Sequence, residues 1–444
     1  MAYKSYLLKR SLAGPFLSTV VMTLLVTGWH GGAVAEEDKL FGGTQRLTSQ
    51  QLLKAVLARN PDIPTMEASW EAAKARVEQA ESLDDPILAY SIAPQTAGED
   101  SMDFGQKLTL SQHLPWPGKR LLRGDVARFE SDAAFAGIEQ VRLKLTEAAR
   151  SAYADWYFVH AAIRINGINK SLLQEFQNIA EIKYSAGRAS KQDALRAEVE
   201  QVLLEHRDIV LERRRRDVLA QMNTLLQRLP DRPLPPPAGL PATIPLPAVE
   251  QLRKQALEHH PELRALAART QASRQRERLA ERNFYPDISL FAGYNTLWNQ
   301  DEKRLTVGAS INIPLQGKRH AAVDEALAMT MRLDSQQRAK VSQLIGEVQR
   351  AVEKVNESEY VLSLYQDRLL PLAEENLEAA RSDYEAGSGN FLDLISAEKN
   401  LMQTQLQREQ ALADYHRRIA ALEQLVGGTL DTQFRGTHIR GNES

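Results

Sequence analysis

The chain contains two similar ten-residue segments, and each ends in an aspartate that could carry chemistry. They read YSAGRASKQD at 184–193 and YEAGSGNFLD at 384–393, so Tyr, Ala, Gly and Asp recur at the same offsets. A carboxylate at such a place can interact with cations through its negative charge. It can also stabilise the first turn of a following helix through the helix dipole. Both interpretations of Asp193 and Asp393 are open at this point, and they are compatible with each other.

Other residue types that carry catalysis or bind metals form no such pattern. The chain has no cysteine, which excludes thiol catalysis, disulfides and cysteine-bound metals. It also lacks the motifs of zinc hydrolases, phosphate-binding loops, serine hydrolases and dinucleotide-binding folds. His259 and His260 are adjacent and would point about 100° apart on a helix, so we expect them to end a short helix. We therefore predict that the protein is no enzyme and holds no metal and no cofactor.

The charge and the N-terminus restrict the class of protein further. The net charge is −2, which gives no electrostatic reason to bind nucleic acid, and the basic run at 213–216 is expected to be a solvated helix face. Residues 1–35 have the pattern of a secretory signal peptide: basic residues, a mostly apolar stretch, and Ala-Val-Ala at 33–35. A membrane anchor is the alternative for this segment. No later stretch is long and apolar enough for a transmembrane helix, so a chain that spans a membrane must use strands.

The two segments belong to a duplication that covers most of the chain. Pro86 corresponds to Pro286, and the Gly-Lys-Arg at 118–120 corresponds to that at 317–319, one residue out of register. Between the copies lies a proline-rich stretch that cannot be helical and serves as an extended connector. The predicted parts are a signal peptide (1–35), a first repeat (36–229), the connector (230–247), a second repeat (248–427) and a polar tail (428–444).

Each repeat is predicted to contain two strands followed by a helical hairpin. The strands are expected near 86–94, 104–114, 287–298 and 304–313, and the hairpins at 119–228 and 319–426. From Leu305 to Ile313 every odd residue is apolar and every even one is polar or Gly. Such runs are typical of a transmembrane β-barrel, although a soluble two-faced sheet shows the same alternation; the export signal favours the barrel. Because four strands cannot close a barrel, three chains with twelve strands are the smallest set that leaves room for a pore.

The hairpins are expected to be long coiled coils. A helix of about 65 residues spans about 100 Å. Gly187 and Gly387 are expected to end the first helix of each hairpin, and Pro371 is expected to bend the second long helix. Apolar residues recur at seven-residue intervals, which indicates a coiled-coil seam. The first series is Val341, Val348, Val355, Leu362 and Leu369, and the second is Leu344, Ala351, Tyr365 and Leu372.

With these elements in place, the chain resembles the TolC family of outer-membrane efflux proteins. The resemblance rests on the two turns, the duplicated plan and the motif at the strand-to-helix passage, which consists of Pro115, Trp116, Pro117, Gly118 and Lys119. Residues 112–119 are most similar to the heavy-metal branch, the partners of cation-exporting pumps. The resemblance implies a mainly α fold with a β-barrel portion. It also implies a homotrimer with a 12-stranded barrel in outer-membrane lipid and a periplasmic helical tunnel. Such a protein is a passive exit duct that works with a periplasmic adaptor and an inner-membrane RND-type pump.

The resemblance also implies a gate at the periplasmic tip. Tyr384 and Asp393 match the family positions that constrict the tip, and Asp193 matches a position that helps lock it. Three copies of Asp393 would form an acidic ring. The family's arginine in the second turn is replaced by Gly389, and a second acidic position is replaced by Ser396. The turn residues are Tyr184, Gly187, Gly387 and Gly389, and the possible gate ion pairs involve Arg188 and Arg196.

Two alternatives remain open. The same fold could export drugs or proteins instead of metal cations. A protein of another class, a periplasmic coiled-coil adaptor or structural protein, would use its strands in a soluble domain, but the duplication argues against it.

Overall fold

The computed structural model describes residues 40–94, 104–296 and 304–430. The chain divides into two units after Thr44, and the following description concerns the second, which begins at Gln45. The predicted signal peptide at 1–35 and most of the predicted tail at 428–444 lie outside the described residues.

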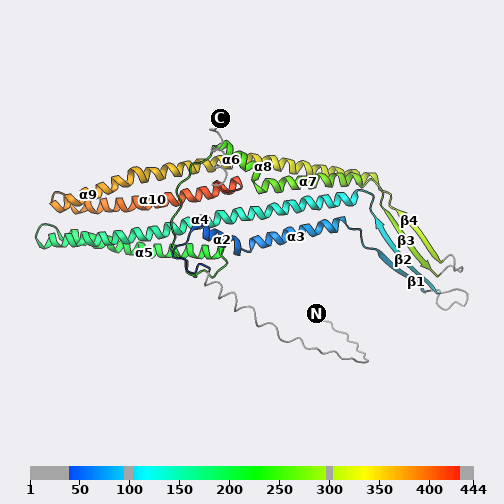
Figure 1. Ribbon diagram of the computed structural model, residues 1–444, viewed down its shortest axis with the longest axis horizontal. Helices are drawn as coiled ribbons and strands as arrows, with labels where there is room; N and C mark the ends of the chain where they lie inside the picture. The colour runs from blue at the N-terminus through cyan, green and yellow to red at the C-terminus, as the bar shows by residue number, and fades with distance from the viewer. Residues whose placement is uncertain (1–39, 95–103, 297–303, 431–444) are drawn as a thin grey trace, which may run out of the picture. The chain divides into compact units, whose positions relative to one another are not determined.

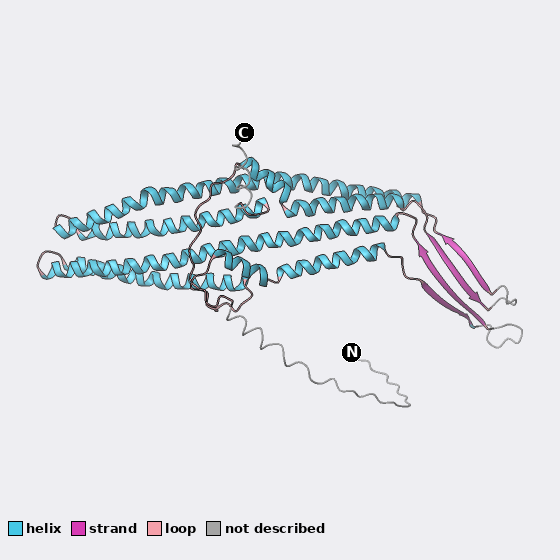
Figure 2. Cartoon of the chain, in the orientation of Figure 1, coloured by secondary structure: helices cyan, strands magenta, loops and turns pink. Residues whose placement is uncertain are grey.

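The second unit is built from long helices and one sheet (Figures 1 and 2). The helices are α2 (Ser49–Arg59), α3 (Asp62–Glu81), α4 (Lys119–Ser185), α5 (Lys191–Leu225), α6 (Val249–His259), α7 (Pro261–Arg282), α8 (Gln316–Leu364), α9 (Leu370–Ala386) and α10 (Phe391–Val426). The strands are β1 (Ile87–Ala93), β2 (Gly105–Leu114), β3 (Ile288–Asn295) and β4 (Leu305–Ile311). As expected, His259 ends a short helix.

Helix α4 is the central element of the unit. It runs for 67 residues without a proline, and alanine supplies many of its buried positions, which lets neighbouring helices approach closely. It packs against α3, α5, α7 and α10. In each repeat two shorter helices lie along one long helix, α3 and α5 along α4, and α7 and α10 along α8 and α9 (Figure 1). The predicted mainly helical fold with two long hairpins is confirmed.

The four strands form one antiparallel sheet in the order β1-β2-β3-β4. The register places Leu108 opposite Tyr294, and Tyr294 opposite Leu305. Since directly opposite residues share a face, one face is apolar across all four strands except at Gln106 and Gln112. Its large exposed apolar members are Leu88, Tyr90, Ile92, Leu108, Leu110, Leu290, Tyr294, Leu305, Val307 and Ile311. Phe291, on the other face, lies over Gly308, where a Cβ would come within 2.5 Å of its ring.

Two apolar clusters hold the helices together. A middle cluster joins α6, α8 and α10 through residues such as Leu252, Val348 and Leu422. A second cluster, here called the tip cluster, joins the two hairpins near their turns. It contains Ile165, Leu173, Phe176, Ala180, Ala197, Leu204, Tyr384, Phe391, Leu394, Ile395 and Met402. Among the described residues, no helix has a stretch long and apolar enough to cross a membrane.

A π-helical turn at Tyr365–Leu369 separates α8 from α9 and changes the predicted seam. The Leu370 N–H donates to the Tyr365 carbonyl, five residues back, so this turn contains one extra residue. Before the turn, Leu344, Val348, Val355 and Leu362 are buried as predicted. From the last residue of the turn onward, the prediction was wrong: Leu369 and Leu372 are 38% and 60% exposed. The covered positions are now Leu370, Ala373, Leu377, Ala380 and Tyr384, one residue later in the heptad.

Pro371 explains where this shift occurs. It lies two residues after the end of the π-helical turn and cannot donate a hydrogen bond to the carbonyl of Asp367. The predicted bend at Pro371 stays a prediction, and what the structure shows beside Pro371 is a change in helical register.

The proline-rich connector is irregular but firmly attached to the helices. Buried Trp156 of α4 donates from Nε1 to the Pro235 carbonyl at 3.0 Å, and the Tyr153 hydroxyl donates to the Gly239 carbonyl at 2.9 Å. The Tyr415 hydroxyl of α10 donates to the Ile244 carbonyl at 3.0 Å. These aromatic residues fix the path of the connector across the helices.

Candidate functional site

The two hairpin turns are closed by glycines with left-handed backbone conformations. Gly187 has φ +73° and Gly387 has φ +82°, a conformation that costs other residues energy. The second turn is tight at Gly389: its N–H donates to the Asp383 carbonyl at 2.9 Å, and a Cβ there would lie 2.9 Å from the Asp383 Cβ. The missing arginine of the resemblance thus coincides with a position that has little room for any side chain.

Tyr384 is the anchor of the second turn. It is 4% exposed, and its ring packs on Phe391 with centroids 5.2 Å apart. Lys183 of the first hairpin lies 4.4 Å from the centre of this ring and donates to the carbonyls of Tyr384 and Glu385. Burial, and then the negative charge of Asp193, raise the pKa of Tyr384 to about 12. Its hydroxyl finds no hydrogen-bond partner among the described residues.

A cavity of about 460 Å³ lies between the two turns. The first hairpin contributes Lys183, Arg188, Ala189, Ser190, Asp193 and Arg196, and the second contributes Tyr384, Gly387, Gly389, Asn390, Phe391 and Leu392. The structure therefore brings together most of the predicted gate residues of both hairpins. Among the described residues of this single chain, neither Arg188 nor Arg196 forms an ion pair with a carboxylate.

Asp393 lies outside the cavity and is exposed. Its N–H donates to Asn390 Oδ1 at 3.0 Å, and Asn390 Nδ2 donates to Asp393 Oδ2 at 2.7 Å. Asp193 has a similar place, with Ser190 Oγ donating to Oδ1 at 3.2 Å. Both aspartates thus stabilise the first turn of a return helix. Tyr184 is half-exposed, and exposed Ser396 donates from Oγ to the Leu392 carbonyl.

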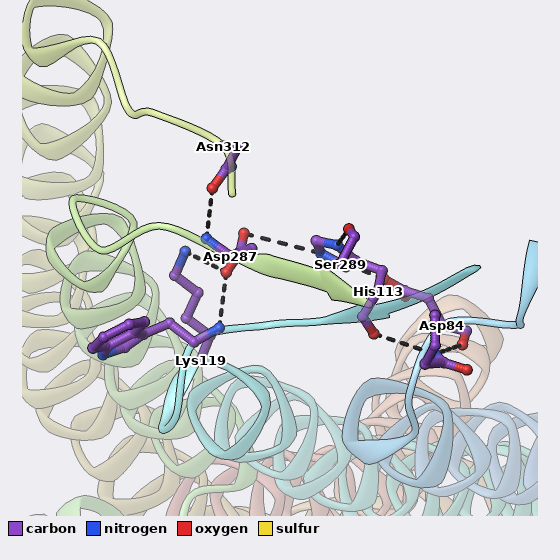
Figure 3. A network of polar contacts seen from close by, with 8 residues as sticks. Asp84, His113, Lys119, Asp287, Ser289 and Asn312 are labelled. Carbon is purple, nitrogen blue, oxygen red and sulfur yellow. Dashed lines mark hydrogen bonds and ion pairs between the residues drawn. The ribbon is translucent and has the colours of Figure 1, made fainter. Parts of the chain in front are cut away.

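The strand-to-helix motif forms a second polar site at the other end of the helices (Figure 3). Lys119 is 1% exposed, and its Nζ donates to Asp287 Oδ1 and to the Tyr285 carbonyl, both at 2.8 Å. The Trp116 N–H donates to the same Asp287 oxygen at 2.8 Å. The Trp116 ring also stacks on Tyr285, with centroids 5.4 Å apart. Gly118, with φ +92°, allows the chain to turn from the strand into α4.

The junction network, defined by Asp84, His113, Asp287 and Asn312, places one residue at the end of each strand that is nearest the helices. His113 Nε2 lies 3.9 Å from Asp84 Oδ2 and 4.0 Å from Asp287 Oδ2. The Asp287 N–H donates to Asn312 Oδ1 at 2.5 Å. Sequence reasoning found Lys119 but missed Asp287. The available signal was that Asp287 directly follows Pro286, which marks the start of a strand.

Within the described parts of the chain, no group of three or more His, Asp or Glu side chains could hold a metal ion.

Comparison with known proteins identifies the family. The sequence profile of the family described as "Outer membrane efflux protein" matches residues 52–227 and again 252–428. The chain belongs to this family. It is an outer-membrane efflux channel with a periplasmic helical tunnel, and its resemblance to the TolC family is confirmed.

Individual relatives are distant but similar in length. The chain is 19% identical to the cobalt-zinc-cadmium resistance protein CzcC of Cupriavidus metallidurans, over 86% of this chain and 90% of that protein. It is 22% identical to nodulation protein T of Rhizobium leguminosarum bv. trifolii, over 95% of each. The solved outer-membrane channel OprN matches with a TM-score of 0.75 at 21% identity, over 88% of this chain and 92% of that one.

Proposed function

We propose that the protein is a homotrimeric exit duct that passively exports heavy-metal cations. An inner-membrane RND-type pump and a periplasmic adaptor deliver the substrate. The three four-stranded sheets close into a 12-stranded barrel in outer-membrane lipid, and the helices form the tunnel. The observation that carries the proposal is the apolar sheet face, on which Val307 is 79% exposed and Leu305 is 68% exposed. In lipid such a face is covered, whereas in water it would promote aggregation.

An apolar stripe on α5 supports the trimer. Leu195, Val199, Val202 and Ile209 follow coiled-coil spacing and are between 49% and 71% exposed. In one chain the helices follow one another in the packing order α5, α4, α10 and α9. A ring therefore closes when the α5 stripe of one copy packs on α8 and α9 of the next. Exposed Leu372 of α9 lies on the side left free in one chain.

The hairpin tips form the gate of this duct. In the ring, Arg188 and Arg196 border a cavity that already contains Asp193 and Tyr384. Exposed Asp393 of a neighbouring copy is the carboxylate that these arginines can pair with when the tip is closed. Three copies of Asp393 attract cations and repel anions at the entrance.

The identity of the exported substrate is the most specific part of the proposal. The similarity to CzcC at 19% identity, together with residues 112–119, supports heavy-metal cations. The similarity to nodulation protein T leaves other cargo as the alternative with the same fold.

Separate experiments test the duct, its cargo and its partners. The purified mature protein, inserted into planar bilayers, should give discrete conductance steps, whereas recovery from the periplasmic soluble fraction contradicts the duct. Deletion of the gene should reduce tolerance to cobalt, zinc and cadmium salts. If metal tolerance is unchanged while drug tolerance falls, the duct stands and the metal cargo is wrong. Copurification with tagged chain identifies the adaptor and pump.

A further inference from the structure

Glu398 is a buried carboxyl in the contact between the two hairpins. It lies on α10 and is 1% exposed. Beside it, Lys399 Nζ donates to Glu200 Oε1 of α5 at 2.6 Å. One turn further along α10, Arg207 Nη1 of α5 lies 3.2 Å from Met402 Sδ. Two contacts between α10 and α5 therefore lie within one helical turn of Glu398.

Glu398 differs from the other buried glutamates of the described chain. Glu409 accepts from the Tyr157 hydroxyl and from Arg408, both at 2.7 Å. Glu423 accepts from Arg150 and from the Leu430 N–H. Glu398 Oε1 has no hydrogen-bond partner among the described residues. A buried carboxylate without a partner is costly, whereas a neutral carboxyl is tolerated at much lower cost.

The charged groups around Glu398 do not remove this cost. Burial, and then the like charge of Glu200, raise the pKa of Glu398 to about 7, against the opposing effect of Lys399 and Arg207.

Near the tip, one basic residue of α4 and one of α9 are engaged elsewhere. Arg381 of α9 pairs with Glu175 and Glu385, and Lys183 of α4 donates to backbone carbonyls. The tip cluster contributes apolar side chains from both helices, among them Phe176 and Tyr384.

We propose that Glu398 is a proton-operated latch that holds the second hairpin against the first. The neutral carboxyl is compatible with the closed contact, and the ionised carboxyl is solvated only when the hairpins separate. The latch acts on the proposed gate and so rests on the proposed function, but the contact itself can be measured without export.

The direction of the pH dependence follows from proton linkage. The ordinary pKa of a glutamate is 4.5, and that of Glu398 in the closed contact is about 7. Between these values the closed state binds more protons than the separated state, so rising pH favours separation. Below 4.5 the closed contact keeps its full stability. Above 7 the ratio of closed to separated hairpins should be lower by on the order of 10²-fold.

The test measures the distance between the tips. Because the chain has no cysteine, Ser185→Cys and Ala386→Cys give two unique sites for spin labels, at the last residues of α4 and α9. The double-cysteine chain is coexpressed with an excess of the cysteine-free chain, so that most trimers carry a single labelled copy. Pulsed EPR on this full-length protein in detergent should show a short distance between the two labels at pH 5.5. A longer distance should gain population toward pH 8, with a midpoint near the pKa of Glu398, about 7.

Two variants make the result specific. Glu398→Gln, which imitates the neutral carboxyl, should keep the short distance at every pH. Glu198→Gln is the matched control, since Glu198 holds the same place in the first repeat but is exposed, and it should keep the wild-type pH response. The proposal is wrong if wild-type distances do not change with pH, or if Glu398→Gln still responds. Either result leaves the conductance and tolerance experiments unaffected.

Discussion

At the scale of single residues, the strongest constraint is the buried ion pair of Lys119 and Asp287. Lys119 was predicted from a motif, but the motif alone does not name its partner, which is 168 positions away. The same holds for Tyr384. The repeated turn predicts its position, whereas its burial depends on Lys183 and Phe391, from the other hairpin and from the helix that follows. The sequence therefore predicts where such a residue lies, but it does not predict which residue of the other repeat is its partner.

Replacing Lys119 should destabilise the junction. Lys119→Met leaves Asp287, whose side chain is 15% exposed, without its counter-charge, and this should cost about 3 kcal/mol of unfolding free energy. Denaturant unfolding followed by Trp fluorescence measures the effect. Lys119→Met with Asp287→Asn should recover part of the loss. Lys74→Met, which breaks an exposed pair with Glu71, should cost less than about 1 kcal/mol. Equal losses in Lys119→Met and Lys74→Met contradict the role of burial.

Asp393 separates the two interpretations of the acidic turn. Asp393→Ala removes both the proposed ring charge and the pairing with Asn390, and should increase the current through the closed channel in bilayers and reduce its cation preference. Asn390→Ala removes the cap, at about 1 kcal/mol of helix stability, and keeps the charge. If Asn390→Ala leaks as much as Asp393→Ala, the carboxylate acts only as a helix cap.

At the scale of elements, the π-helical turn marks the point beyond which sequence periodicity no longer predicts which residues are buried on the seam. A regular heptad predicted Leu369 and Leu372 on the seam, and the extra residue moved the seam to Leu370 and Ala373. Pro371 indicated that the second long helix is irregular near this position. A proline alone, however, is compatible with a bend, a break or a change of register. The choice depends on which side chains fit the tip cluster, since Leu377 packs against it, and this is a tertiary property.

A single deletion tests the register shift. Removing exposed Gln366 from the π-helical turn should restore a regular α-helix in which Leu370, Leu377 and Tyr384 continue the seam of Val355 and Leu362. Thermal unfolding monitored by circular dichroism should therefore change little, by less than about 1 kcal/mol in unfolding free energy.

The control is a deletion within α8. Removing exposed Asn356 rotates Ser358 and Leu362, both buried, by about 100° away from the seam. It should cost several times more stability than removing Gln366. Similar losses in the two deletions would refute the compensating role of the π-helical turn.

At the scale of the whole molecule, the fold was predictable because it is repetitive. Long helical segments, glycines at the turns and alternating strands each leave a strong local pattern in the sequence. Because the chain is duplicated, each pattern occurs twice. The sheet order and its apolar face needed the structure, because pairing across repeats has no local signal. The same is true of the α5 stripe, because the sequence alone does not show that its four residues are exposed in a single chain.

The stripe gives a prediction for assembly. Val199→Glu with Val202→Glu introduces charges at the centre of the proposed subunit contact and should convert trimers into monomers in native mass spectrometry. Leu229→Glu is the control, since Leu229 is 57% exposed but lies outside the stripe, and it should remain trimeric. A trimer that persists with both glutamates places the subunit contact elsewhere.

The pairing of β2 with β3 also determines when the sheet can form during export. Leu108 lies opposite Tyr294, so strand β2 leaves the export machinery long before its partner strand β3 does. Local hairpins form early, whereas such distant contacts form slowly. Until β3 arrives, β1 and β2 form only a two-stranded ribbon, which is marginally stable and exposes an unpaired edge. The first half of the chain must therefore be protected from aggregation until the second half has been exported, and completion of the sheet is a late event in biogenesis.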